Sequence, residues 1–232
     1  LAINNAAAHP RIRPQAFVCS DPPKKFSHSI WLDPCIMKFV PTPKLNGRRS
    51  RLRQKTPTGF VDMQKGVPDC PNVWAFQRHS WLRPNDDFFT ADGALWGNHE
   101  SGCRKTGEKK TVCTMLLGLR LLYYLGARRI YLLGVDFRMD AGYGYSFNQD
   151  RAEDAVSSNN GQFAVVNEWL VKMQNDGVFK RFGLEVFNCY QSSGLRAFPY
   201  VPFESAIKDA CGIIEQVPDL SNYYDPEPSR SK

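Results

Sequence analysis

The chain has 232 residues, 42% of them hydrophobic, and a net charge of +7, which suits one folded domain of ordinary size with a sizeable core. No run of about 18 apolar residues occurs, so we expect no membrane span, and no signal-peptide pattern opens the chain. The seven cysteines form no CxxC pairs, which favours reduced thiols in a cytoplasmic setting and argues against structural zinc.

The N-terminal third predicts strands more than helices. Short apolar runs at 1–4, 15–20, 35–40 and 73–77 are bounded by proline or polar residues, as strands are. The segment 41–69 is rich in Pro, Gly, Lys and Arg with little periodicity, so we interpret it as a long basic loop. Because the chain opens in an apolar run already under way, we expect the natural protein to begin upstream with a further strand and its loop.

The second half alternates helix and strand. Apolar residues before Gly126 repeat at helical spacing, and this glycine stands where a helix C-terminus takes the left-handed conformation. The run 130–133 lacks alternation, as in a parallel strand covered on both faces. A helix at 161–174, a strand at 184–189 and a helix at 203–217 follow.

This order of elements predicts an α/β fold with a mostly parallel, three-layer sheet. We expect one domain over residues 1–217 and a disordered tail at 218–232. Open parallel sheets bind ligands at the carboxyl edge of their strands, so the polar residues that follow the strands are the first candidates for a site.

Four such residues follow two of the predicted strands. Asn4 and Asn5 end the first strand, where side-chain amides can contact a nucleotide, although Asn pairs also form turns. Gly134 and Asp136 follow the strand at 130–133, and the carboxylate can hold a metal, a ribose hydroxyl or the loop itself.

The loop at 138–148 is rich in glycine and aromatic residues. Tyr143, Tyr145 and Phe147 alternate along it. Aromatic rings can flank a base or a sugar, and tyrosine hydroxyls can donate to phosphate. We therefore include Tyr143 and Tyr145 among the candidate donor-binding residues.

The segment 102–111, GCRKTGEKKT, is similar to a phosphate-binding loop, but Glu108 interrupts the P-loop pattern. A basic, glycine-containing loop that enters a helix at Thr111 or Thr114 still offers backbone amides to an anion. The alternative is an ordinary helix start capped by threonine.

Basic residues cluster twice, at 44–55 and at 104–110. Such clusters suit a polyanion, such as nucleic acid, although a single basic run is more often a solvated loop. No histidine has metal-ligand spacing, and His99 is a candidate general base or a surface histidine. The candidate phosphate contacts are Arg48, Arg49, Arg51, Arg53, Arg104 and Lys105.

The order of these motifs resembles a group of Rossmann-like transferases. The group includes the family 42 sialyltransferases and the set related to the MptE-like pterin diphosphokinases and the Maf flagellin-glycosylation proteins. The shared features are an early Asn, a helix start with a hydroxyl, the run 125–137, the YSF at 145–147 and the SSGLRAFP at 192–199.

The resemblance implies a GT-A-like variant of the α/β fold with its N-terminal strand truncated. It also implies a nucleotide-sugar or nucleotide-diphosphate ligand at the sheet edge. Its contacts would be Asn4 or Asn5, Thr111 or Thr114, and Tyr143 or Tyr145. The sialyltransferases place a catalytic His after the aromatic loop, whereas the matching stretch here, 155–163, has none. Another base is then needed, and the candidates are His99, Asp136, Asp140 and Asp150.

Our leading hypothesis is a glycosyltransferase that moves a sugar from a nucleotide-activated donor to a polyanionic acceptor, for example a hydroxymethylated base in DNA. The requirement for Mg²⁺ or Mn²⁺ stays open. One alternative is diphosphoryl transfer to a small alcohol, which needs Mg²⁺ and a carboxylate cluster. Another is a nucleic-acid-binding protein, or an inactive relative, with no catalysis.

Overall fold

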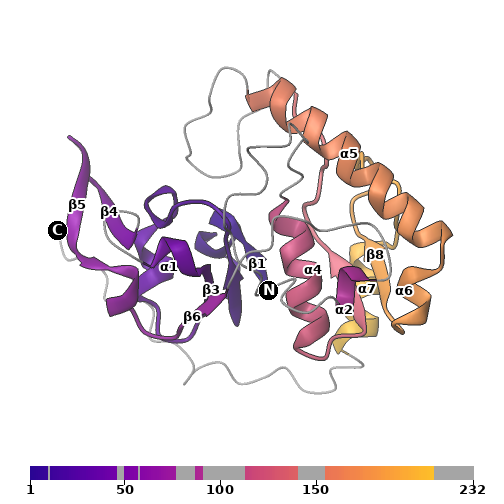
Figure 1. The fold of residues 1–232 in the computed structure, drawn as a ribbon, viewed down its shortest axis with the longest axis horizontal. Coiled ribbons are helices and arrows are strands. Elements are labelled where there is room, and N and C mark those ends of the chain that lie inside the picture. The colour runs from indigo at the N-terminus through magenta and orange to yellow at the C-terminus, as the bar shows by residue number, and fades with distance from the viewer. Residues whose placement is uncertain are drawn as a thin grey trace.

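Two β-containing groups lie on either side of helix α4 (Thr114–Tyr124) in the computed structural model (Figure 1). The structure describes residues 1–9, 11–45, 50–56, 58–76, 87–90, 113–140 and 155–211. The expected helix beyond residue 211 and the tail at 218–232 lie outside this set.

The first group is a parallel sheet with strand order β1-β2-β3-β6. Its strands are β1 (Ala2–Ile3), β2 (Ala16–Val18), β3 (Met37–Pro41) and β6 (Val73–Phe76). Each overlaps a run that the sequence predicts as a strand, although β3 extends to Pro41, one residue beyond the run 35–40. The expectation of an α/β fold with a mostly parallel sheet is confirmed.

The two faces of this sheet pack against different elements. On one face, Phe17 meets Phe26 and Trp31 edge to face, at ring separations of 5.6 and 5.4 Å. This cluster is closed by η1 (Asn4–Ala8) and α1 (His28–Leu32). On the other face, Val18 and Phe39 pack against α4. The alternation of side chains along β2 and β3 produces these two faces.

Helix α4 is buried on two sides. Leu117 and Leu121 contact the four-stranded sheet, whereas Leu116 and Leu119 enter the core of the second group. The helix ends as predicted, with Gly126 at φ +92°. Its N–H donates to the carbonyl of residue 123 and the next N–H to that of residue 122, which is the Schellman arrangement.

The second group contains a separate two-stranded parallel sheet, β7 (Arg129–Leu132) and β8 (Glu185–Asn188). Among the described residues, no ladder joins it to the larger sheet. The long helix α5 (Ala155–Asn175) runs along the outer side of this group (Figure 1). Three further short helices are η2 (Pro23–Lys25), α2 (Asp87–Thr90) and α6 (Val178–Arg181).

The expectation that the run 130–133 is covered on both faces is wrong. Ile130 and Leu132 are buried, but Leu133 is 57% exposed and Tyr131 is half-buried. The outward face instead meets helix α7 (Phe203–Cys211) through polar contacts, because the Tyr131 hydroxyl donates to Asp209. The hydroxyl of Tyr131 requires a hydrogen-bond partner, so this face of the strand packs against a polar surface.

The segment 41–69 is not a loop. It forms η3 (Thr42–Lys44), an antiparallel hairpin of β4 (Arg51–Thr56) and β5 (Gly59–Gly66), and η5 (Val67–Asp69). The hairpin forms because Leu52, between two arginines, is fully buried in the aromatic cluster, and Gly59 supplies the positive φ of the turn at +132°.

Within the described ranges, no helix is long and apolar enough to cross a bilayer. The six cysteines that the structure describes are free thiols.

The docking of α7 predicts a response to acid. Arg129 contacts both Glu185 and Asp209, and the hydrogen bonds from Tyr131 and Arg129 hold the pKa of Asp209 below its ordinary value. The ionised Asp209 therefore stabilises the docked helix at pH values above the ordinary pKa of an aspartate. This stabilisation is lost as the pH falls through the lowered pKa of the folded state. We expect amide protection of α7 to weaken below about pH 4.

Hydrogen exchange of the α7 amides between pH 7 and pH 3 tests this response. Asp209→Asn should lower protection already at pH 7 and remove the acid-dependent step. Glu204→Gln, which changes an exposed carboxylate at the start of α7, is the control and should behave as the wild type. An acid-dependent step that persists in Asp209→Asn would contradict the assignment.

Candidate functional site

Three polar residues gather where β1 and β2 end and α4 begins. Asn4 directly follows β1, Ser20 is the second residue after β2, and Thr114 opens α4. The Ser20 and Thr114 hydroxyl oxygens lie 2.7 Å apart in a hydrogen bond. Because Ile3 pairs with Val18 in the parallel register, Asn4 falls next to the Ser20 end of β2. We call these three residues the sheet-edge site.

Asn4 carries a strained backbone and an unsatisfied acceptor. Its φ is +54°, in the left-handed region that asparagine tolerates better than most residues. Its side-chain oxygen Oδ1 is buried and has no hydrogen-bond partner among the described residues. A buried acceptor without a donor costs about 1–3 kcal/mol, so a ligand N–H or O–H would stabilise this position.

Asn5 has a different role. Its Oδ1 accepts the Ser27 N–H at 3.1 Å, and its Nδ2 donates to the Lys25 carbonyl at 3.2 Å. The side chain is therefore engaged by the backbone of the segment that leads into α1. Of the two predicted asparagines, Asn4 is the one whose side-chain oxygen has no hydrogen-bond partner among the described residues.

The electrostatics of the site favour anion binding over nucleophilic catalysis by a thiol. Cys19 precedes Ser20 and Cys113 precedes Thr114, and burial raises the pKa of both thiols, which keeps them protonated. The N-terminus of α4 contributes partial positive charge from its first amides. Hydroxyls beside a helix N-terminus are suited to phosphate oxygens.

The loop that contains Asp136 lies at the same end of α4. Helix α4 is followed by a tight turn and then β7, so the carboxyl end of β7 returns toward the start of the helix. Met115 and Phe137 belong to the same core cluster. The Asp136 side chain is exposed and has no partner among the described residues. It remains a candidate base.

Backbone contacts fix the shape of this loop. Gly134 has φ +64°, and the Asp136 carbonyl accepts the Gly194 N–H at 2.7 Å. The Asn160 side chain of α5 forms two hydrogen bonds with the Met139 backbone. It accepts from the Met139 N–H at 2.7 Å and donates to the Met139 carbonyl at 2.8 Å. The loop is therefore held by both α5 and the 192–199 segment.

Several predicted site residues lie outside the described part of the chain. They are His99, Thr111, Tyr143, Tyr145, Asp150, Arg48, Arg49, Arg104 and Lys105. Ser20 was missed by the sequence analysis, although it ends the apolar run 15–20 at the edge where parallel sheets bind ligands. The signal that identifies Ser20 is a hydroxyl residue at the end of a predicted parallel strand.

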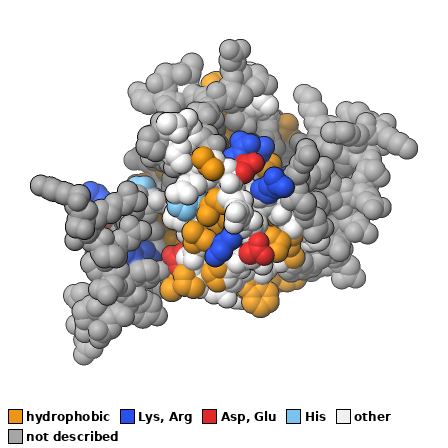
Figure 2. Space-filling model, turned by 90° about the vertical axis from the view of Figure 1, so that its left-hand side faces the viewer, with side chains coloured by type: hydrophobic (Ala, Val, Ile, Leu, Met, Phe, Trp, Pro, Cys, Tyr) orange, Lys and Arg blue, Asp and Glu red, His pale blue; other side chains and the backbone are white. Residues whose placement is uncertain are grey.

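The two described arginines of the basic segment lie on the hairpin rather than at the sheet-edge site. Arg53 Nε is 2.8 Å from Asp62 Oδ1, and Arg51 is exposed. The side of the molecule that carries the hairpin shows Lys and Arg mixed with Asp, Glu and hydrophobic side chains (Figure 2). The described part of this surface is therefore not a patch of a single charge.

Among the described residues, no group of three or more His, Cys, Asp or Glu side chains could hold a metal ion. Comparison with known proteins adds no family: no family model, no curated protein and no solved structure matches the chain. The resemblance to Rossmann-like transferases therefore stays a prediction from the order of motifs.

Proposed function

We propose that this protein is a transferase that binds a nucleotide-activated donor at the sheet-edge site, and specifically a nucleotide-sugar-dependent glycosyltransferase. The observation that carries the proposal is the 2.7 Å hydrogen bond between Ser20 and Thr114, which joins a strand end to a helix N-terminus. This pairing of elements is the common location of nucleotide phosphates in open parallel sheets.

In this proposal, the donor phosphate accepts from the first amides of α4 and from the Thr114 hydroxyl. The unsatisfied Oδ1 of Asn4 accepts a hydrogen bond from the base or sugar of the donor. The bond between the anomeric carbon and the phosphate oxygen breaks as the acceptor oxygen bonds to that carbon. The acceptor proton passes to Asp136 or to His99, and the nucleotide leaves with its phosphate.

A thermal-shift comparison tests donor binding. We expect one of UDP, CDP, GDP and ATP, at about 100-fold over its Kd, to stabilise the wild type by about 2.7 kcal/mol. Thr114→Val removes the hydroxyl but keeps the shape of the side chain. It should lower the affinity for that nucleotide about tenfold, a loss of about 1.4 kcal/mol of binding free energy.

The matched control for this comparison is Thr58→Val, in the exposed turn of the hairpin, which should bind as the wild type does. Failure of every nucleotide to stabilise the wild type would contradict the proposed site. Equal binding by Thr114→Val and Thr58→Val would contradict the role of Thr114.

Mass spectrometry tests the transfer step and the proposed acceptor. Duplex DNA that contains hydroxymethylated pyrimidines should gain the mass of one sugar when incubated with the protein and the matching nucleotide sugar. If Asp136 is the base, Asp136→Asn should lose this activity while nucleotide binding persists, whereas retained activity would assign the role to His99. Asp176→Asn, directly after α5, is the control. Binding without any mass gain would reject glycosyl transfer to this acceptor.

A further inference from the structure

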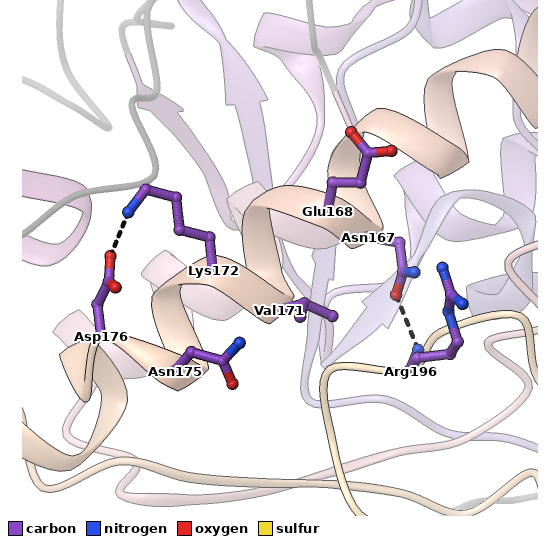
Figure 3. Close-up of a pocket in the computed structure, with 7 residues that line it drawn as sticks. All are labelled: Asn167, Glu168, Val171, Lys172, Asn175, Asp176 and Arg196. Carbon is purple, nitrogen blue, oxygen red and sulfur yellow. Dashed lines mark hydrogen bonds and ion pairs between the residues drawn. The ribbon is translucent and has the colours of Figure 1, made fainter.

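A second candidate site lies on α5, at the far side of the second group from the larger sheet. It is a cavity of about 550 Å³ between α5 and the segment around residue 196, within the size range of small-ligand sites (Figure 3). We call it the α5 pocket. Its lining residues are Asn167, Glu168, Val171, Lys172, Asn175, Asp176 and Arg196.

At its base is a buried amide with a free donor group. Asn167 is only 4% exposed, and its Oδ1 accepts the Arg196 N–H at 2.8 Å. That hydrogen bond fixes which end of the amide faces the backbone, so the NH₂ group is the end left for the cavity. No hydrogen bond from this NH₂ group to a described residue is seen, so it is free to donate to a ligand.

A guanidinium lies beside this amide. The side-chain nitrogens of Asn167 and Arg196 lie on the same side, at one end of the pocket (Figure 3). The Arg196 side chain is exposed and forms no ion pair with any described residue. Neighbouring N–H donors of an arginine and an amide match the two oxygens of a carboxylate.

The remaining charges of the α5 pocket limit what it can bind. At the other end, Lys172 is neutralised by Asp176, at an Nζ–Oδ2 distance of 2.5 Å. Glu168 is exposed and has no ion partner among the described residues. The unpaired charges are thus one cation, Arg196, and one anion, Glu168. This balance disfavours a polyphosphate and suits a ligand that carries one charge of each sign.

We propose that the α5 pocket binds a small zwitterion, namely a free α-amino acid with an aliphatic side chain. Its carboxylate accepts from Arg196 and from the Asn167 amide, and its ammonium group donates to Glu168. The half-buried Val171, which packs against the core, provides the apolar surface for the aliphatic side chain. This site is separate from the donor site and does not depend on the proposed transferase activity.

Isothermal titration of the full chain with L-leucine tests the proposal. L-leucine should bind, whereas N-acetyl-L-leucine, which lacks the ammonium group, and L-leucinamide, which lacks the carboxylate, should each bind at least tenfold more weakly. Inorganic phosphate should not compete. No binding of L-leucine, or equal binding of the two blocked forms, would overturn the proposal.

Three variants locate the binding. Asn167→Asp keeps the acceptor for the Arg196 N–H but loses the NH₂ donor, so the affinity for L-leucine should fall at least tenfold. Glu168→Gln changes an exposed residue and so leaves the fold intact. It should lower the affinity for L-leucine but leave the affinity for N-acetyl-L-leucine unchanged. Lys180→Gln, on α6 outside the pocket, is the control. Wild-type affinity in both pocket variants would contradict the assignment.

Discussion

Replacement of Arg120 by methionine is expected to raise the free energy of unfolding by about 1–4 kcal/mol. Arg120 is fully buried on α4, and its three guanidinium nitrogens have no hydrogen-bond partner among the described residues. Its described neighbours are the rings of Phe88 and Tyr124, with centroids 5.6 and 5.9 Å from the guanidinium carbon. Burial lowers the pKa of Arg120, and the nearby Tyr124 hydroxyl, although not in hydrogen-bond geometry, opposes this shift only in part.

Urea unfolding of Arg120→Met measures this effect, with Lys180→Met as the control. Lys180 is an exposed cation on α6, and its replacement should change the unfolding free energy by no more than about 0.5 kcal/mol. A loss of about 3–5 kcal/mol in Arg120→Met would contradict the account, because it would show that the guanidinium has a buried anionic partner.

Gly194→Ala is expected to lower the free energy of unfolding by about 1–3 kcal/mol. An added Cβ would lie 2.7 Å from the Phe137 carbonyl oxygen and 3.3 Å from the carbonyl carbon. The backbone cannot retreat freely, because the Gly194 N–H donates to the Asp136 carbonyl at 2.7 Å. The same change should displace the loop that holds Asp136.

Gly161→Ala is the matched control for this substitution. Gly161 lies within α5, and nothing lies within 4 Å of an added Cβ. Alanine at this position should raise the free energy of unfolding by about 0.5–1 kcal/mol. It lowers the conformational entropy of the unfolded chain and has a higher helix propensity than glycine. Equal effects of the two substitutions, measured by urea unfolding, would contradict the close approach at Gly194.

Local sequence patterns predict the framework of the fold. The runs that become β1, β2, β3 and β6 are short, mainly apolar and followed by polar residues or proline, so their approximate positions are visible in the sequence. The C-terminus of α4 is equally local, because Gly126 adopts the positive φ that its position indicates. Such features depend on neighbouring residues alone.

The remaining features depend on tertiary contacts. The sequence of the hairpin resembles a loop because Leu52 stands among charged residues, and only the burial of this leucine against the aromatic cluster identifies a strand. The pairing of Ser20 with Thr114 joins residues 94 positions apart, which no local pattern encodes. The one-sided burial of β7 follows from the contact between Tyr131 and Asp209, also distant in sequence.

Amide chemical shifts test the central claim of nucleotide binding at the sheet-edge site. The isotope-labelled chain is titrated with the nucleotide that gives the largest thermal stabilisation. We expect the largest shift changes at the amides of Asn4, Ser20 and Thr114, with the hairpin and α5 little affected. Largest changes on the hairpin or on α5, with Asn4, Ser20 and Thr114 unmoved, would contradict the account.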